Sequence, residues 1–229
     1  MTHSERLAAM RARNQKQPRV PLPDVKAYWQ ARWQKATKPK EEMTLTIEQL
    51  RQVMPLLPES RAVEYLPHLQ AAIYECEINT PARIAAFLAQ IAHESGQLKY
   101  WAEIWGPTLA QKRYEGRADL GNTQTGDGKR FKGRGPIQIT GRSNYRKYAG
   151  LLDLPLIDKP ELLELPMHGF RSAAAFWATN GLNAIADEDT VVAFSRITRR
   201  INGGYNGLAD RRKYWARAKD ALRDLAGEK

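Results

Sequence analysis

The stretch that decides the fold is residues 86–105, AFLAQIAHESGQLKYWAEIW. It continues a helical pattern that starts at Thr80-Pro81, an N-cap residue followed by proline at the first helical position. Apolar residues then recur at i, i+3, i+4 and i+7, which predicts an amphipathic helix ending at Gly96. These apolar residues are Ile84, Phe87, Leu88 and Ile91. Glu94 lies on the same stripe, where a carboxyl group is costly unless something is gained.

The position of Glu94 makes it a candidate general acid. It follows Ile91 by three residues and Phe87 by seven, which places it on the buried side of the helix. Burial and the negative end of the helix dipole both raise the pKa of a carboxyl group. A carboxyl group that stays protonated near neutral pH can donate a proton in catalysis. A buried glutamate paired with an arginine is the structural alternative, and the pattern alone leaves both open.

Two further glutamates are candidates for a second catalytic carboxylate. Glu103 and Glu115 follow Glu94 by nine and 21 residues, and either could face it across a groove. Aromatic rings beside acids suit stacking on the apolar faces of sugars, although core packing explains them equally well. The aromatic residues beside Glu103 are Tyr100, Trp101 and Trp105. Glycosidases typically use two carboxylates that face each other across a sugar-sized cleft.

Composition narrows the class of protein. The 229 residues suit one domain with some additional sequence, and 42% hydrophobic residues support a real core. The net charge of +11 favours an anionic partner, such as nucleic acid, a membrane surface or a cell-wall polymer. Cys76 is the single cysteine, which excludes an intrachain disulfide and a cysteine-based zinc site. The four histidines have no metal-ligand spacing, so we expect no metal site.

Residues 1–42 differ from the rest of the chain. They hold ten Lys and Arg against four acids, so they carry +6 of the net charge. We interpret them as a basic N-terminal extension with short helices around 4–13 and 24–36, serving either as a solvated linker or as a binder of an anionic envelope surface. The sequence has no signal peptide and no apolar run of membrane-spanning length. We therefore expect synthesis in the cytoplasm and access to an external target through another protein.

A single, mainly helical domain is predicted for residues 43–229. Thr46 and Gln49 form a capping-box pattern that begins a helix. Residues 116–136 are rich in glycine and predict irregular backbone, after which PIQIT alternates like a short strand at 136–140. Further helices are expected at 61–78 with a kink at Pro67, and at 143–150, 168–179, 188–201 and 208–226.

Several segments together resemble glycoside hydrolase family 19, which contains chitinases and phage-type endolysins. They are FLAQIAHESG (87–96), YEGRADLGNTQTGDGKRFKGRGPIQITGRSNY (114–145), INGGYNG (201–207) and DRRKYW (210–215). The likeness spans roughly 46–226 and is closer to the phage-type enzymes. It implies a lysozyme-like, mainly α-helical fold with two lobes around a central cleft and a small loop or β insert. It also implies hydrolysis of β-1,4-linked N-acetylhexosamine polymers without a cofactor.

The resemblance also assigns site residues. It makes Glu94 the general acid, whereas the base matches Glu103 in similar phage enzymes and lies nearer Glu115 in plant chitinases. Thr140 matches the residue that helps to hold the attacking water, and Arg211 matches an arginine that supports the carboxylates. The remaining substrate-binding positions that it implies are His93, Gln138, Asn144, Tyr145 and Asn202.

The family mechanism inverts the configuration of the sugar, which requires the two carboxyl groups to lie ~6.5–9.5 Å apart. Our main hypothesis is a monomeric endolysin that cleaves peptidoglycan between N-acetylmuramic acid and N-acetylglucosamine and lyses a host cell. The positive charge favours peptidoglycan, which carries free carboxylates, over uncharged chitin, and the cysteines of plant chitinases are missing. The nearest alternative is a chitinase or an antibacterial effector on the same fold. A non-catalytic glycan-binding module would predict loss of Glu94, and no motif supports a nucleic-acid binder.

Overall fold

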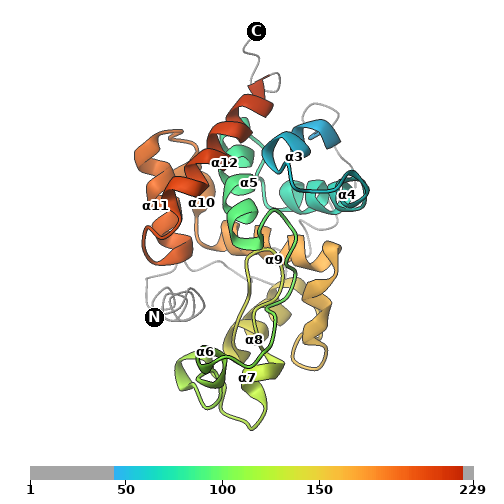
Figure 1. Ribbon diagram of the computed structural model, residues 1–229, viewed down its shortest axis with the longest axis vertical. Coiled ribbons are helices and arrows are strands. Elements are labelled where there is room, and N and C mark those ends of the chain that lie inside the picture. The colour runs from blue at the N-terminus through green and yellow to red at the C-terminus, as the bar shows by residue number, and fades with distance from the viewer. Residues whose placement is uncertain (1–43, 224–229) are drawn as a thin grey trace.

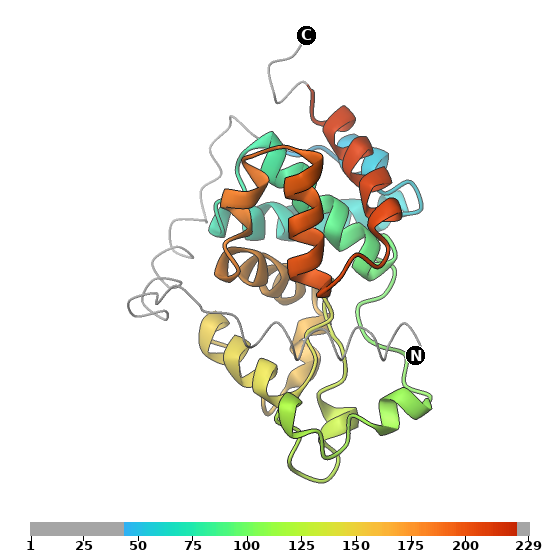
Figure 2. The same ribbon diagram turned by 90° about the vertical axis from the view of Figure 1, so that its left-hand side faces the viewer.

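The computed structural model describes residues 44–223. The basic extension of residues 1–42 and the helices predicted at 4–13 and 24–36 lie outside the described residues. The described chain is mainly helical, as predicted, and consists of a larger helical body and a smaller lobe (Figures 1 and 2). No helix among these residues is long and apolar enough to cross a membrane.

The larger body is built around α5 (Pro81–Ser95). Helix α12 (Leu208–Ala221) packs along α5, and α3 (Ile47–Val53) packs against α12. Helix α4 (Glu59–Glu75) packs against α9 (Pro166–Thr179). The body is completed by α10 (Leu182–Ala186) and α11 (Val191–Asn202).

The ends of α5 follow the local signals in the sequence. The side chain of Thr80 accepts a hydrogen bond from the Arg83 N–H at 3.2 Å, and Pro81 is the first helical residue. Gly96 ends the helix in the left-handed conformation with φ of 59°, which glycine adopts without steric cost. Between these ends the predicted amphipathic stripe is too narrow, because every residue from Ile84 to Ala92 is buried. A helix that is apolar all round belongs in a core.

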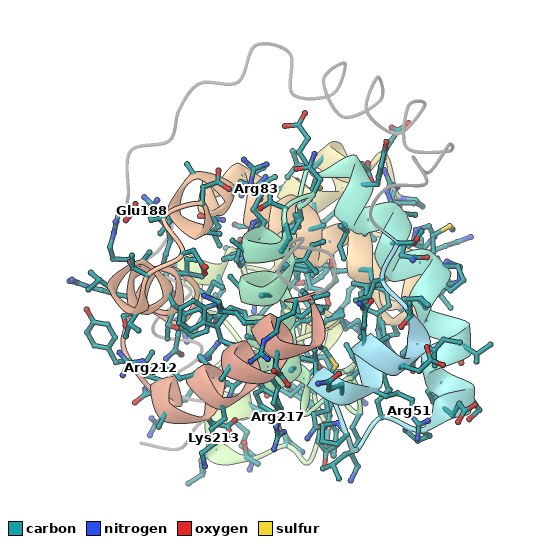
Figure 3. The ribbon with its side chains drawn as sticks, turned by 90° about the horizontal axis from the view of Figure 1, so that it is seen from above. Arg51, Arg83, Glu188, Arg212, Lys213 and Arg217 are labelled. Carbon is teal, nitrogen blue, oxygen red and sulfur yellow. The ribbon has the colours of Figure 1, made fainter. Side chains whose placement is uncertain are left out.

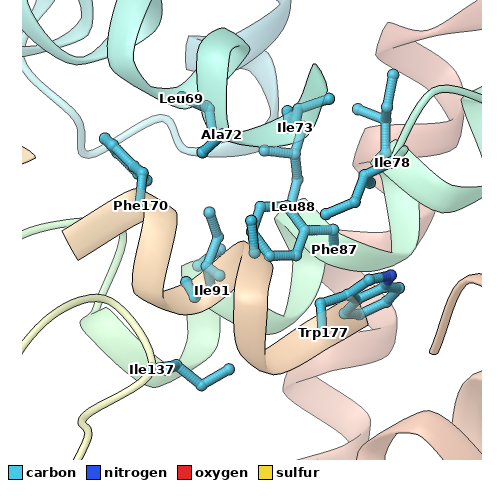
Figure 4. Close-up of a cluster of buried hydrophobic side chains, with 14 of the residues drawn as sticks. Leu69, Ala72, Ile73, Ile78, Phe87, Leu88, Ile91, Ile137, Phe170 and Trp177 are labelled. Atoms are coloured by element: carbon cyan, nitrogen blue, oxygen red, sulfur yellow. The ribbon is translucent and has the colours of Figure 1, made fainter. Parts of the chain in front are cut away.

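The core shows why α5 is enclosed. Four alanines (Ala85, Ala86, Ala89 and Ala92) let neighbouring helices approach closely. On another face, Phe87 packs edge-on against Trp177 of α9, with ring centroids 5.5 Å apart (Figure 4). Helices α4 and α9 are further joined by a buried ion pair, in which Arg171 donates to Glu75 at 2.8 and 2.9 Å.

Several predicted helix boundaries are corrected by the structure. The capping box is confirmed, because Thr46 and Gln49 each accept the other's backbone N–H, at 3.1 and 2.9 Å. The helix predicted at 188–201 is α11, which begins three residues later, at Val191. Asp189, just before it, has a left-handed φ of 42°, and Thr190 caps the helix. The helix predicted at 168–179 begins two residues earlier, at Pro166, because proline suits the first helical turn.

The smaller lobe contains α6 (Leu109–Lys112), η1 (Ala118–Leu120), α7 (Asp127–Arg130) and α8 (Arg142–Leu152). A 3₁₀ helix, η2 (Pro160–Glu164), leads back to α9. The strand predicted at 136–140 is wrong. Within residues 44–223 the backbone forms isolated bridges only, Ala102 with Arg134 and Arg134 with Ile139.

A tight turn replaces the predicted strand. The N–H of Gln138 donates to the carbonyl of Gly135 at 2.9 Å, and both residues have positive φ, 55° and 74°. The alternating pattern of PIQIT therefore spans a reversal of the chain. The C-terminal end of α5 and the connection between α11 and α12 both face the smaller lobe (Figures 1 and 2).

Candidate active site

Glu94 and Arg211 form a buried ion pair between α5 and α12. The guanidinium NH2 lies 2.5 Å from Oε1 of Glu94, and the two side chains are 1% and 3% exposed. The structure thus combines both sequence-based interpretations, a buried carboxyl group and an arginine partner. Burial favours the neutral form of Glu94, whereas Arg211 favours the ionised form. Arg211 can therefore stabilise the negative charge that Glu94 would carry after losing a proton.

A buried polar network holds Arg211 in place. Its NH1 donates to Oε1 of Gln90 at 2.5 Å, and its Nε donates to the carbonyl of Asn206 at 3.4 Å. Gln90 in turn donates to Oγ1 of Thr198 at 2.9 Å, so the network joins α5, α11 and α12. Sequence reasoning missed Gln90, although it lies one turn before Glu94 in an otherwise apolar stretch.

His93 makes a second contact between α5 and α12, beside the first. Its Nδ1 lies 2.7 Å from Oδ2 of Asp210, so two consecutive residues of α5 pair with two consecutive residues of α12. Burial and the positive charge of Arg211 lower the pKa of His93, and the bond to Asp210 partly opposes them. The ring also packs on Gly207, where a Cβ would lie 2.3 Å from Cε1 of His93. Asp210 was not foreseen from the sequence.

Asn202 supports the same region from the end of α11. Its side chain is buried, and Nδ2 donates to the carbonyl of Asn206 at 3.1 Å. That carbonyl also accepts the bond from Arg211. In this structure Asn202 thus holds the connection that follows it.

Glu103 belongs to the segment that joins α5 to the smaller lobe. It is half-buried, and its carboxylate accepts hydrogen bonds from Gln111 Nε2 at 3.2 Å, the Tyr114 hydroxyl at 3.4 Å and the Gly133 N–H at 3.2 Å. The backbone N–H of Glu103 donates to the carbonyl of Gly133 at 2.8 Å. These contacts fix the carboxylate beside the Gly133–Thr140 segment.

Gly133 brings Gln138 and Thr140 to Glu103. A Cβ on Gly133 would lie 2.6 Å from Oε1 of Gln138 and 3.2 Å from Oγ1 of Thr140, so a side chain here would displace the Gln138 amide group. Oγ1 of Thr140 donates to the carbonyl of Gln138 at 2.9 Å. The left-handed backbone of Gln138 is uncommon for a residue with a side chain and occurs preferentially at functional sites. The structure therefore brings together three residues that the resemblance assigned.

Asn144 adjoins this group, whereas Tyr145 is placed differently. Nδ2 of Asn144 donates to the carbonyl of Thr140 at 2.8 Å. Tyr145 is completely buried, which raises the pKa of its hydroxyl group well above the usual range. That hydroxyl donates to the Lys132 carbonyl at 2.7 Å and accepts from NH1 of Arg134 at 2.9 Å. Tyr145 thus supports the segment before Gly133 and presents no surface to a substrate in this structure.

Glu115, the other candidate base, closes the glycine-rich loop. It is exposed, and its two carboxylate oxygens accept the backbone N–H groups of Gly126 at 2.5 Å and Gly128 at 2.8 Å. A Cβ on Gly128 would lie 2.8 Å from Oε2 of Glu115. Two arginines of this region pair with other acids, Arg117 with Asp119 and Arg134 with Glu164.

The aromatic residues near Glu103 divide into core and surface. Trp101 packs edge-on against Tyr65 and Phe170, with centroids 5.0 and 5.1 Å away, and so belongs to the core. Trp105 is half-buried beside Tyr114, and Tyr100 is exposed. Between residues 44 and 223, no three His, Cys, Asp or Glu side chains gather as metal ligands.

Comparison with known sequences gives consistent matches. Residues 70–205 match the family model of glycoside hydrolase family 19, described as class I chitinase. A glycosyl hydrolase family 19 domain-containing protein of Haemophilus influenzae is 33% identical over 161 residues, covering 57% of this chain and 76% of that protein. An endochitinase of Arabidopsis thaliana is 39% identical over 122 residues, covering 53% of this chain and 39% of that protein. The chain thus spans about two fifths of the Arabidopsis endochitinases that it matches.

Solved structures agree on the fold. Chitinase C from Streptomyces griseus HUT6037 has a TM-score of 0.64 at 23% identity, covering 81% of this chain and 95% of that chain. A bacterial family 19 chitinase has a TM-score of 0.63 at 22% identity, covering 79% and 95%. These likenesses confirm the predicted lysozyme-like, mainly α-helical fold.

Proposed function

Because the chain belongs to glycoside hydrolase family 19, we propose that it hydrolyses β-1,4 bonds of an N-acetylhexosamine polymer with Glu94 as general acid and Glu103 as general base. The observation that supports this most is the grouping of Glu103 and Thr140 around Gly133, with Glu94 buried against Arg211. Glu103 and Thr140 are suited to hold a water molecule, and Glu94 is suited to donate a proton.

The reaction is a single displacement. Glu103 removes a proton from a water molecule oriented by Thr140, and the water oxygen forms a bond to the anomeric carbon. The bond from that carbon to the leaving oxygen breaks as Glu94 gives that oxygen its proton. Glu94 then carries a negative charge, which the guanidinium of Arg211 at 2.5 Å stabilises until a proton returns from solvent. The product has inverted configuration.

Glu103 is preferred to Glu115 as the base because of what each carboxylate does. Glu115 is occupied by two backbone N–H groups of the glycine-rich loop, a structural task. Glu103 is bonded to Gly133, beside the hydroxyl group that the family resemblance assigns to the attacking water. We therefore assign Glu115 to the support of the loop.

Two polymers are candidate substrates. Chitin is favoured by the relatives, several of which are named endochitinases. Peptidoglycan, with an endolysin role in the lysis of a bacterial host, is favoured by charge, since residues 43–229 retain +5 of the +11 after the +6 of residues 1–42 is removed. Three exposed cations, Arg212, Lys213 and Arg217, lie along α12 (Figure 3). An anionic polymer would be attracted to this surface, and an uncharged one would not.

The experiment that tests the function uses both polymers. The full chain is incubated with glycol chitin and with purified sacculi, and new reducing ends are quantified and identified by mass spectrometry. We expect hydrolysis by the wild type and a loss of about 10²–10⁴-fold in Glu94→Gln, whose amide cannot donate the proton. Reducing-end N-acetylmuramic acid from sacculi would identify a muramidase, and release from glycol chitin alone would identify a chitinase. Activity of Glu94→Gln within threefold of wild type would refute the assignment.

A further inference from the structure

The connection between α11 and α12, residues 203–207, is held close to Glu94 by hydrogen bonds and packing. The carbonyl of Asn206 accepts hydrogen bonds from Asn202 and from Arg211, and Arg211 contacts Glu94 directly. Gly207 lies against the ring of His93, the residue before Glu94. The position of this connection relative to Glu94 is therefore set by several independent contacts.

The backbone of the connection is also defined. It opens at Gly203, the C-cap of α11, with φ of 73°, and closes at Gly207, the N-cap of α12, with φ of 69°. The N–H of Leu208 donates to the carbonyl of Tyr205 at 3.1 Å. Two left-handed glycines bound the connection, and the closing hydrogen bond makes Tyr205 the first residue of the turn that leads into α12.

Tyr205 is a large exposed residue in the middle of this connection, with 55% of its surface accessible to solvent. Single exposed apolar residues are common and need no explanation, as for Leu56 or Val63. Tyr205 differs because its backbone neighbour Asn206 is tied to the counter-ion of Glu94. The connection to which it belongs, between α11 and α12, faces the smaller lobe (Figure 2).

We propose that Tyr205 forms a stacking subsite for one N-acetylhexosamine ring of the bound glycan, next to Glu94. The apolar C–H face of the sugar lies on the phenol ring, and the hydroxyl group stays in water or bonds a sugar hydroxyl group. A tyrosine ring on a pinned turn loses little conformational entropy on binding, since it has only two side-chain torsions. This inference rests on the proposed function and names a residue that binds the polymer.

The test separates binding from hydrolysis. Glu94→Gln is used as the background, and the affinity for the hexamer of β-1,4-linked N-acetylglucosamine is measured by titration calorimetry with and without Tyr205→Ala and Tyr205→Phe. We expect Tyr205→Ala to weaken binding about tenfold and Tyr205→Phe to stay within threefold, because phenylalanine keeps the ring. In the chain with an intact acid, Tyr205→Ala raises KM for the hexamer more than it lowers kcat.

Val192→Ala is the matched control. Val192 is 69% exposed, and it lies at the opposite end of α11, ~15 Å from Asn202 along the helix axis. It should leave affinity and KM unchanged. Affinity of Tyr205→Ala within twofold of the background, with unchanged melting temperature, would overturn the stacking subsite while wild-type hydrolysis still stood. A wild type that neither binds nor cleaves the hexamer or sacculi would overturn the proposed function as well.

Discussion

Replacing Arg211 with methionine removes one partner of the buried Glu94–Arg211 pair. Methionine fills a similar volume but has no charge, so Glu94 keeps its 3% exposure without a counter-ion. Gln90 and the Asn206 carbonyl also lose a donor. Breaking one side of a buried pair typically costs 3–5 kcal/mol, so the free energy of unfolding should fall by about that amount. For a domain of this size the melting temperature should drop by roughly 6–20 °C.

The loss of stability in Arg211→Met should increase as the pH rises. Without Arg211, the buried carboxyl group of Glu94 favours its neutral form, so its pKa in the folded variant rises above the unfolded value of about 4.3. A group whose folded pKa is raised contributes stability at low pH and loses it as pH rises. The difference between wild type and Arg211→Met should therefore be smallest near pH 4 and grow toward pH 8.

The assay is urea unfolding at pH 4, 6 and 8, with two comparison variants. Arg212→Met makes the same change one residue later, on an exposed side chain that donates to Ser195, and should cost less than about 0.5 kcal/mol. The double variant Glu94→Gln/Arg211→Met should lose less free energy of unfolding than the two single variants lose in sum, because it leaves no buried charge without a partner. Equal losses for Arg211→Met and Arg212→Met at every pH would refute the reasoning.

The remaining predictions concern the base, the contact between His93 and Asp210, and the basic extension. Glu103→Gln should lower kcat by ~10²-fold or more, whereas Glu115→Gln should lower the melting temperature and keep kcat within tenfold; the reverse pattern would exchange their roles. Asp210→Asn should shift the NMR titration midpoint of His93 further below its ordinary value, because Asp210 favours the charged imidazole; an unchanged or raised midpoint would contradict this. Removing residues 1–42 should weaken binding to sacculi at low salt only and leave the hydrolysis of soluble fragments unchanged. Equal binding of the full and the shortened chain at low salt would show that these residues serve only as a linker.

Local signals in the sequence determined the ends of the helices near the site. The capping box at Thr46, the Thr80-Pro81 start and the Gly96 stop act through contacts within four residues, so no tertiary structure is needed to recognise them. The same periodicity placed Glu94 on a buried face. Family motifs then pointed to Glu103 and Thr140.

Only the tertiary structure decided which groups surround the carboxylates. The partner of Glu94 lies 117 residues away, and it reaches the carboxylate because α12 packs along α5. The packing also encloses α5 on all sides, which its apolar stripe did not indicate. The choice between Glu103 and Glu115 likewise depends on which carboxylate meets Gly133 and which meets the N–H groups of the glycine-rich loop. Hydrogen bonds between distant segments form only when the chain has folded, so spacing along the sequence carries no record of them.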